Sequence, residues 1–449
     1  MSEESLNNPG DVLWDELFLT TANGEEVDLA NFVMELNLYE DIYAPILYGD
    51  LAITDAVNAI TNFPIRGGEI VTFKIRTPTF EDSKSNILEK SFSIYSIENR
   101  IQSGDREQFY VLKFCSIEGL VDNFNHLAVH YSGKTDDIVE KIWNDTLGQP
   151  RRIDSEDISV LSIGDTPHQS EVEYVSNFWS PFQNMMFLSK RATGGGLEGN
   201  DFLFFESNKS FYFTSIQALI KEQKEELFDE YHINPQGLTK PHRTGGVSYI
   251  GNLLPDGFNN ISSMGMPSTV DLLVGASSGM LAASTRAFDY TTKETKEWVF
   301  DMRKDFAGFV HTDDGVSIPE GIPRDPYAYQ IFKPTSQGNY GKVPYGIAKF
   351  GKTELLRQGY LAGLTQYTFE IDVSGRTDIQ VGVMIRINYP NVGDKTGDGE
   401  TPAEDPILSG NYLVTAIKHK IDYVGHTMKM EVVKNGLAEN LGQPGDDNV

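Results

Sequence analysis

Residues 379–387 read Ile-Gln-Val-Gly-Val-Met-Ile-Arg-Ile and carry the clearest secondary-structure signal in the chain. Apolar side chains occupy every second position, at Ile379, Val381, Val383, Ile385 and Ile387. Side chains alternate between the two faces of a β-strand with a period of two, whereas an amphipathic helix repeats every 3.6 residues. The stretch therefore predicts a strand with one buried face.

Further strands are predicted near both ends of the sequence. Residues Asn411–Lys420 and Thr427–Lys434 predict a hairpin that turns around Val424-Gly425. Near the N-terminus, apolar and polar residues alternate over Val71–Arg76, Phe92–Glu98 and Gln108–Cys115, and a turn-like Gln-Ser-Gly-Asp cluster separates the last two. This spacing makes the first 120 residues a candidate for a small antiparallel barrel or sandwich.

Helices are expected in the middle of the chain. Thr135 can cap a helix whose first turn carries two aspartates, which suit the positive end of the helix dipole, and this helix would end at Gly148. A second helix is predicted to start at Ser180-Pro181 and run to Ala192, followed by glycines at 194–196. Phe202–Glu206 predicts a short buried strand, so this section is α+β.

The next segments give a mixed signal. Residues 221–230 are charged and predict a solvated helix or linker, whereas Ile261–Val274 and Met280–Phe300 predict strands joined by a turn at Gly275–Gly279. Residues 301–350 are rich in Gly, Pro and Tyr with little periodicity and predict a long ordered connection or an inserted lobe. A helix capped by Thr353 is expected to follow, with these apolar residues on one face: Leu356, Tyr360 and Leu364.

Composition excludes several classes of protein. Hydrophobic residues make up 39% of the 449 residues, which is enough for packed cores and argues against disorder. The 37 basic and 65 acidic residues give a net charge of −28, which opposes binding to phosphate backbones. Cys115 is the single cysteine, so an internal disulfide is impossible. The acidic start of the sequence lacks the pattern of a secretory signal, and no apolar stretch has membrane-spanning length, so we expect synthesis in a cytoplasm.

Two short motifs invite a chemical interpretation. Gly275-Ala-Ser-Ser-Gly279 matches the nucleophile elbow of a hydrolase, but that elbow needs a strand-to-helix turn in a parallel layout, and the flanks here predict antiparallel strands. Asp394, Thr396, Asp398 and Asp405 partly follow a calcium loop, although the loop closes with Asp rather than Glu and lacks flanking helices. A Gly/Ser-rich hairpin and an ordinary acidic loop explain both motifs.

The histidines form no recognisable site either. His126 and His130 have the spacing of one helix face, but no third ligand follows at a credible distance, and two histidines seldom suffice for a metal. His419 and His426 flank the predicted C-terminal hairpin, where cross-strand packing explains them. We therefore predict no catalytic, cofactor-binding or metal-binding residues, no cofactor, and no enzymatic activity. Paired acids for glycan cleavage stay open, because carboxylate geometry is not visible in a sequence.

Four groups of segments, in their order along the chain, carry a family resemblance. They are Asn31–Thr54 with Gly67–Phe73, Tyr110–Gly119 with Thr135–Leu147, Ser180–Ala192 with Phe202–Glu206, and finally Val381–Arg386, Leu408–Val414, His419 and Thr427–Val433. In this order they resemble the baseplate hub proteins of contractile-tailed, T-even-type phages, a family related to the hub part of type VI secretion spike proteins. Residues 301–350 have no counterpart in the resemblance.

The resemblance implies an architecture. It implies an α+β, β-rich fold with two antiparallel, tube-like β-barrel domains, an α+β domain and an inserted lobe. The corresponding boundaries are 1–120 for the N-terminal barrel, 121–220 for the α+β domain, 221–300 with 351–436 for a discontinuous second barrel, 301–350 for the lobe or long connection, and 437–449 for a flexible tail.

The resemblance also implies a function. It implies a structural subunit of the virion tail baseplate, which forms a homotrimeric ring around the channel for DNA and joins the tail tube to the central spike. The implied partners are further copies of the chain, the tail tube protein, the central spike protein and other baseplate proteins, without specific nucleic-acid binding or a membrane segment. Two alternatives remain: a tail-associated cell-wall hydrolase, and a bacterial carbohydrate-binding or adhesion protein.

Overall fold

The structure is a computed structural model that describes residues 9–438 with interruptions. The interruptions are at 22, 78–86, 103, 105–106, 149–160, 164–170, 194–200, 234–257, 270, 290–292, 306–307, 315–324, 328, 336–349 and 392–403. The predicted helix stop at 194–196, most of the calcium-like loop and much of 301–350 therefore lie outside the described residues. Within the described ranges, no helix has the length and apolar content to cross a membrane.

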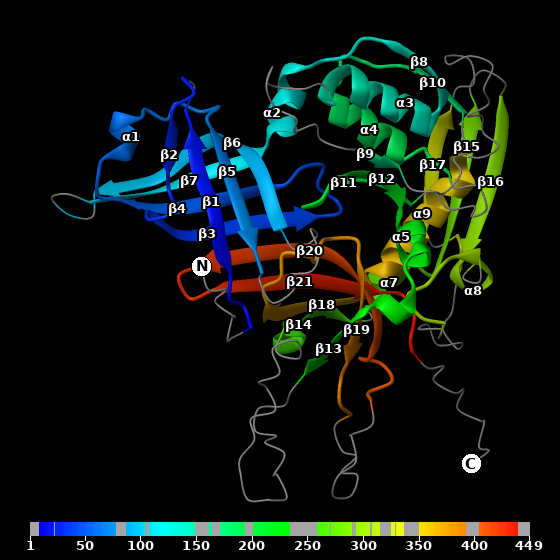
Figure 1. The fold of residues 1–449 in the computed structure, drawn as a ribbon. Helices are drawn as coiled ribbons and strands as arrows, with labels where there is room; N and C mark the ends of the chain where they lie inside the picture. The colour runs from blue at the N-terminus through cyan, green and yellow to red at the C-terminus, as the bar shows by residue number, and fades with distance from the viewer. Residues whose placement is uncertain are drawn as a thin grey trace, which may run out of the picture.

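Thirteen strands form one continuous sheet that dominates the molecule (Figure 1). In sheet order they are β19 (Met384–Asn388), β13 (Asp229–Ile233), β14 (Asn260–Thr269), β18 (Tyr367–Ser374), β21 (His426–Lys434), β20 (Gly410–Asp422), β3 (Val33–Asp41), β4 (Tyr48–Asp55), β7 (Gln108–Ser116), β6 (Ile87–Gln102), β5 (Ile70–Arg76), β1 (Leu13–Thr20) and β2 (Glu26–Asp28). The predicted C-terminal hairpin is confirmed as β20 and β21.

The first six of these strands close into a barrel, because β19 pairs with β20 as well as with β13. The barrel is mixed rather than purely antiparallel, since β13 runs parallel to both of its neighbours. Its interior is filled by side chains that solvent does not reach, among them Tyr231, Phe369, Ile385, Tyr412 and Met430. The prediction of a β-rich α+β fold with a barrel is thus confirmed.

The other seven strands form an N-terminal sheet with its own core. Phe92 lies at its centre, with its ring centroid 5.1 Å from that of Phe73 and 4.9 Å from that of Phe114. Gly49 on β4 faces this cluster, and a Cβ there would lie 2.4 Å from the Phe114 ring, so the aromatic packing requires glycine. The short helix α1 (Ala59–Asn62) lies beyond β4. Among the described strands, no pairing joins β2 back to β3.

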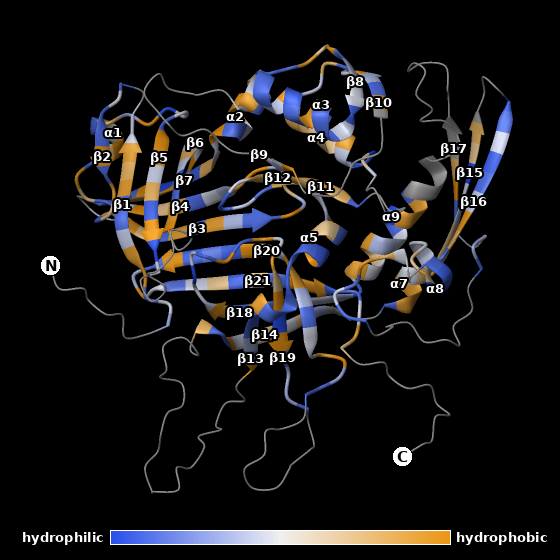
Figure 2. Ribbon diagram, turned by 45° about the vertical axis from the view of Figure 1, so that its right-hand side comes forward, coloured by the Kyte–Doolittle hydropathy of each residue, from blue (hydrophilic) through white to orange (hydrophobic). Residues whose placement is uncertain are grey.

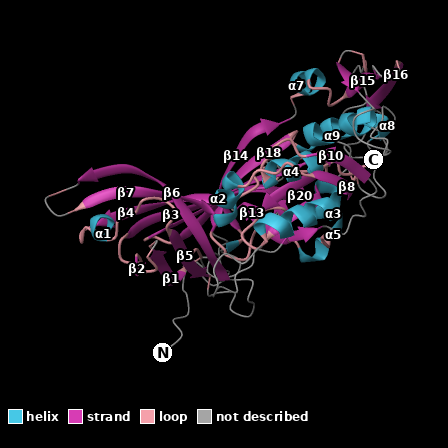
Figure 3. Cartoon of the chain, turned by 90° about the horizontal axis from the view of Figure 1, so that it is seen from above, coloured by secondary structure: helices cyan, strands magenta, loops and turns pink. Residues whose placement is uncertain are grey.

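The α+β unit lies between the N-terminal sheet and the lobe that carries β15 (Ala282–Asp289) and β16 (Glu294–Asp301), with its first helix, α2, next to the N-terminal strands (Figure 3). Its elements are α2 (Ile117–Phe124), β8 (His130–Lys134), α3 (Thr135–Ile142) with the π-helical turn η3 (Trp143–Leu147), β9 (Leu161–Ile163), β10 (Glu171–Val175), α4 (Pro181–Ser189), β11 (Phe202–Glu206), β12 (Phe211–Ser215), α5 (Ile216–Glu222) and the turn η4 (Glu225–Leu227).

Local signals explain where these helices begin. Ser180 caps α4 as predicted, with a capping box in which Ser180 and Gln183 bond reciprocally. The predicted cap of α3 is wrong by one position: Lys134 is the N-cap, it makes no side-chain cap, and Thr135 is buried as the first helical residue.

A separate lobe consists of a three-stranded sheet packed on a long helix. The strands are β15 (Ala282–Asp289), β16 (Glu294–Asp301) and β17 (Gln330–Thr335); the helices are α7 (Leu272–Ser277), α8 (Met302–Asp305) and α9 (Phe350–Leu364). Phe300, Leu355 and Leu356 lie in its core. The exposed edge strand β16 is mostly hydrophilic (Figure 2).

The lobe corrects two predictions. The strand expected over Ile261–Val274 ends at Thr269, and Gly275–Gly279 is not a hairpin turn, because α7 occupies this region. The Asp271 carboxylate accepts hydrogen bonds from the backbone N–H groups of Leu273 and Val274 and so starts the helix. Strand β15 pairs with β16 on one edge and with β17 on the other, and the described residues of these three strands form no pairing with the barrel. The domain boundaries themselves stay a prediction.

Two other predictions differ from the structure at a boundary. The strand expected over 379–387 begins at Met384, because Gly382 adopts a φ of 83° that no strand contains, although Ile379 and Val381 are buried as the alternation requires. Leu437, the first residue of the predicted flexible tail, is 1% exposed and belongs to the barrel core.

Candidate functional site

The most distinctive feature of the molecule is the junction where the barrel meets the N-terminal sheet. Both are built on β20. Gly410–Leu413 pair with β19 and close the barrel, whereas Ala416–Asp422 pair on the same edge with β3. A register shift between Val414 and Ala416 separates the two halves. A bulge of this kind bends a strand and increases its twist, which lets β20 leave the barrel wall and enter the other sheet.

The bulged residue, Thr415, is itself bonded into the junction. Its carbonyl oxygen accepts a 3.0 Å hydrogen bond from the backbone N–H of Ile42, which follows β3. Its hydroxyl donates to the carboxylate of Glu431 on β21 at 2.7 Å. The Thr415 carbonyl and hydroxyl are therefore both bonded, and the two sheets share one continuous strand.

A buried polar trio crosses the junction. Glu40 on β3, His419 on β20 and His426 on β21 are each no more than 1% exposed. The Nε2 atom of His419 lies 3.1 Å from Oε1 of Glu40, and its Nδ1 atom lies 3.1 Å from Nε2 of His426. Burial, together with the neighbouring His419, holds the pKa of His426 well below its usual range. We call these three residues the junction trio.

Glu40 also connects the junction to the rest of the fold. Its Oε2 atom accepts hydrogen bonds from the backbone N–H of Asn208, in the turn between β11 and β12, at 3.1 Å, and from that of Val381, in the segment before β19, at 3.4 Å. One carboxylate on the N-terminal sheet thus binds the α+β unit and the barrel at once. Together with the bond to His419, these make three hydrogen bonds, which is typical of a buried carboxylate that stays satisfied.

A second buried carboxylate, Glu206 on β11, ties the α+β unit to the N-terminal sheet. It accepts hydrogen bonds from the backbone N–H of Leu47 at 2.8 Å and from the Ser116 hydroxyl, and it pairs with the ammonium of Lys90 on β6. Burial raises the pKa of the Glu206 carboxyl, and the nearby Lys90 ammonium opposes this shift. The three parts of the molecule are therefore held in one fixed arrangement by bonded buried charges.

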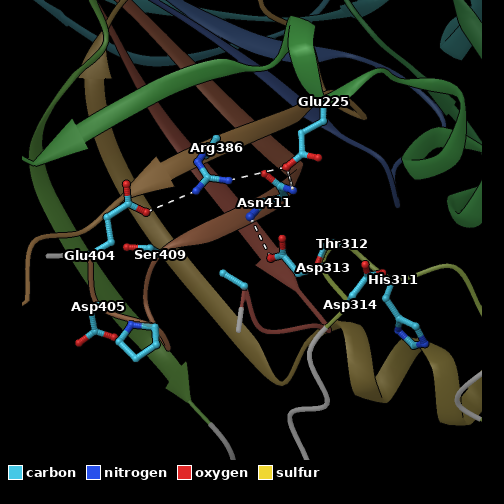
Figure 4. A pocket seen from close by; sticks show the side chains of 12 residues that line it. Glu225, His311, Thr312, Asp313, Asp314, Arg386, Glu404, Asp405, Ser409 and Asn411 are labelled. Carbon is cyan, nitrogen blue, oxygen red and sulfur yellow. Dashed lines mark hydrogen bonds and ion pairs between the residues drawn. The ribbon is translucent and has the colours of Figure 1, made fainter. Parts of the chain in front are cut away.

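A polar pocket of about 330 Å³ opens beside the barrel (Figure 4). Five of its twelve lining residues are acidic: Glu225, Asp313, Asp314, Glu404 and Asp405. The others include Arg386, His311, Thr312, Ser409 and Asn411. Several of these groups bond to one another, as the dashed lines show. The Arg386 guanidinium lies 3.7 Å from Glu225 and 3.4 Å from Glu404, and the Asn411 side-chain amide donates to Glu225 at 3.0 Å.

Asp313 is the unusual group in this pocket. It accepts a 2.9 Å hydrogen bond from the backbone N–H of Asn411, but burial raises its pKa to about 6. Burial also lowers the pKa of the Lys434 ammonium to about 8, although the nearby Asp313 carboxylate opposes that change. Among the described residues, no three His, Cys, Asp or Glu side chains are arranged to hold a metal ion.

The structure separates the residues that the sequence had suggested for chemistry. His126 follows α2 and stacks on Phe178, with ring centroids 5.1 Å apart, whereas His130 lies on β8 and pairs with Glu173 at 3.1 Å, so the two histidines do not share a helix face. Cys115 is buried on β7, and burial raises the pKa of its thiol to about 11. Of the calcium-like loop, only Asp405 is described.

The other suggested residues have structural partners. The hydroxyls of Ser277 and Ser278 donate to the carbonyls of Val274 and Gly275 within their own helix, which is not the geometry of a nucleophile elbow. His419 and His426 do meet across strands, as expected. Glu40, which completes the trio, was missed because it is one acidic residue in an alternating strand 379 residues away from His419.

Comparisons with solved structures find phage tail proteins with a similar fold. No family model and no curated protein matches the sequence. A tail protein from Neisseria meningitidis MC58 has 10% sequence identity, with 94% of this chain and 97% of that chain covered at a TM-score of 0.54. The 43 kDa tail protein of prophage MuSo2 from Shewanella oneidensis also has 10% identity, with 94% and 98% covered at a TM-score of 0.52. An Escherichia coli type VI secretion component aligns at a TM-score of 0.40, which is too low to support an argument.

At this level of identity the comparisons establish the fold. The chain has the fold of phage tail proteins over nearly its whole described length, which confirms the resemblance to tail proteins that the order of segments had indicated.

Proposed function

We propose that this chain is a structural subunit of a contractile phage tail, namely the baseplate hub protein that joins the tail tube to the central spike. The observation that carries the proposal is the whole-length match to a tail protein, which covers 94% of one chain and 97% of the other. The match is not confined to a common barrel, since it extends over the α+β unit and the N-terminal sheet as well.

The proposed assembly is a homotrimer. Each subunit offers two strand-rich units, the closed barrel and the N-terminal sheet, joined by β20. Three copies around one axis would present six such units to a sixfold tail tube, while the assembly keeps threefold symmetry for the spike. The shared strand and the buried carboxylates Glu40 and Glu206 support this role, because a ring that transmits force between tube and spike needs subunits whose parts do not rotate against each other.

The proposed ring encloses a channel for DNA. A net charge of −28 opposes adhesion of a phosphate backbone, which suits a channel through which the genome passes without binding. The proposed partners are the tail tube protein, the central spike protein and other baseplate proteins, within the virion tail. A channel lined by lysine and arginine would contradict this part of the proposal.

The stoichiometry can be tested by light scattering of the purified full-length protein, with and without a candidate spike protein. We expect a particle of about three times the chain mass of 50.1 kDa for the protein alone, or a complex that contains three chains plus the mass of the bound spike after the spike is added. A monomer that stays monomeric in the presence of spike and tube proteins would overturn the proposed hub.

One observation favours a second candidate, a tail-associated cell-wall hydrolase. A carboxyl with a raised pKa in an open acidic pocket, as at Asp313, is the kind of group that glycan-cleaving enzymes use as a general acid. This candidate predicts turnover of purified peptidoglycan that is abolished in Asp313→Asn. The hub proposal predicts no turnover by either protein.

A further inference from the structure

We infer that the acidic pocket beside the barrel is a binding site for the guanidinium group of an arginine side chain from a partner protein (Figure 4). The site holds this group between the carboxylate of Asp313 and the side-chain oxygen of Asn411, both of which line the pocket. The inference concerns the single subunit and does not depend on the proposed role in a tail.

One acceptor in the pocket lacks a donor. Asn411, on β20, lines the pocket and is only 6% exposed. Its side-chain nitrogen donates to the Glu225 carboxylate at 3.0 Å, which fixes the orientation of the amide. Its Oδ1 atom is buried and receives no hydrogen bond from any described residue. An unpartnered buried oxygen is unfavourable, so this atom points to a donor that the described part of the chain does not supply.

Asp313 provides a second acceptor next to the first. Its Oδ2 atom accepts a 2.9 Å hydrogen bond from the backbone N–H of Asn411. The carboxylate and the side chain of Asn411 are therefore held side by side in the lining, as Figure 4 shows. One ligand that carries several N–H groups can reach both.

The two cations near Asp313 are bonded to other groups. Arg386 lies within 3.7 Å of two other carboxylates of the lining. Lys434 donates to the backbone carbonyls of Ile407 and Ser409. Burial raises the pKa of Asp313 to about 6 although both cations oppose this shift. The subunit thus leaves the charge of Asp313 only partly compensated.

Close packing of the backbone holds Asp313 in place. A Cβ on Gly410 would lie 2.5 Å from Oδ2 of Asp313, and one on Gly436 would overlap its backbone carbonyl. The Thr312 N–H donates to Oδ1 of Asn435 at 3.0 Å, and the Asn435 N–H donates to the Thr312 hydroxyl at 3.3 Å. Two glycines and a reciprocal pair of hydrogen bonds therefore fix the carboxylate before a ligand arrives, which lowers the entropic cost of binding.

The chemistry of the lining favours a guanidinium. Five carboxylates line the pocket, yet no three of the described His, Cys, Asp or Glu side chains are arranged for a metal ion. A guanidinium carries five N–H donors in one plane, so it can serve Asp313 and Asn411 together, and it is less strongly hydrated than an ammonium. Arg386 already shows this mode of binding, because its guanidinium lies between two carboxylates of the same lining.

A side chain of a partner protein is the source that fits the pocket. Its volume of about 330 Å³ is near the lower limit for small-molecule sites, which are also mostly apolar, whereas this lining is polar. Arginine is enriched among the residues that carry binding energy in protein interfaces. The excess of 65 acidic over 37 basic residues in the chain favours a basic surface on the partner.

Saturation-transfer NMR of the full-length protein with short peptides tests the site. The probe is acetyl-Gly-Arg-Gly-amide, and the uncharged control peptide carries citrulline in place of arginine. We expect the arginine peptide to bind about tenfold more tightly than the citrulline peptide and about threefold more tightly than the lysine peptide. Asp313→Asn should weaken binding of the arginine peptide about tenfold. Asp137→Asn, which removes the same charge from an exposed residue of α3, should leave binding unchanged.

Three results would overturn the inference. Equal effects of Asp313→Asn and Asp137→Asn would assign binding to the overall negative charge. A citrulline peptide that binds as tightly as the arginine peptide would exclude the guanidinium. Free methylguanidine that binds while the arginine peptide does not would contradict a partner side chain as the source.

A second variant keeps the test decisive if Asp313→Asn does not fold. Asp314 is exposed and also lines the pocket, so Asp314→Asn disturbs no buried contact. It should weaken binding of the arginine peptide about threefold, since a surface charge contributes less than a buried one. An Asp314 variant that binds as tightly as Asp137→Asn would refute the site.

Discussion

Replacing Asp313 by asparagine should stabilise the protein at neutral pH. The carboxyl has an ordinary pKa of 3.8 in the unfolded chain and of about 6 in the folded protein, because burial disfavours its charged form. Between these values the folded state holds more protons than the unfolded state. Its stability therefore falls as the pH rises through this window, and the full penalty applies above pH 6.

The size of the effect follows from the two pKa values. The difference between 3.8 and about 6 corresponds to roughly 3 kcal/mol at neutral pH. Asp313 lies at the edge of an open pocket, so screening by solvent reduces the gain on removing the charge. Asparagine can still accept the hydrogen bond from the Asn411 N–H. We expect Asp313→Asn to raise the free energy of unfolding by about 1–2 kcal/mol at pH 7.5 and by roughly a third of that amount at pH 4.5, where most of the carboxyl is still protonated in the folded protein.

Urea unfolding followed by tryptophan fluorescence at both pH values measures this difference. Asp314→Asn removes the same charge from the adjacent, exposed residue and should change stability by less than about 0.5 kcal/mol. If Asp313→Asn is instead destabilising at pH 7.5, attraction to Lys434 outweighs burial and the reasoning is wrong. The comparison uses variant and wild type at each pH rather than one pH profile, so that the contributions of all other titrating groups cancel.

Two further predictions test the packing of the N-terminal sheet and its bond to the α+β unit. Gly49→Ala should lower the free energy of unfolding in urea by about 2–3 kcal/mol, because its Cβ would lie 2.4 Å from the Phe114 ring. Gly265→Ala, at an exposed strand position where the nearest atom would be 3.9 Å from the Cβ, should be neutral or slightly stabilising. Equal effects of the two substitutions would contradict the packing argument. Glu206→Gln should lower the free energy of unfolding by about 2–4 kcal/mol, because its buried ion pair with Lys90 loses one member. Glu89→Gln, which breaks the surface ion pair with Lys74, should cost less than about 0.5 kcal/mol. A Glu206 variant as stable as the wild type would show that the buried charge is dispensable.

Local signals in the sequence were sufficient for several elements. The β20–β21 hairpin followed from alternation around Val424-Gly425, and α4 followed from the Ser180-Pro181 start, because strand period and capping chemistry act within a few residues. The alternation at 379–387 correctly marked burial. It could not show that Gly382 interrupts the strand, because the bond of Gly382 to Val414 depends on a distant segment.

The junction could not be predicted for the same physical reason. Which strand pairs with each half of β20 depends on the bulge at Thr415, and one residue of register changes the partner of every side chain. Glu40 and His419 meet only after β3 has paired with β20, so neither residue is unusual in the sequence alone. Helix α7 was missed because Gly and Ser in its interior disfavour a helix, and the Asp271 cap compensates only in the folded chain.

The central claim is that three copies of this chain form a ring, and electron microscopy of the purified complex with its spike tests it most directly. Averages viewed along the particle axis should show threefold symmetry with six strand-rich units around an open channel, two from each subunit. A particle without threefold symmetry, or single subunits with no channel in the presence of the spike, would contradict the account.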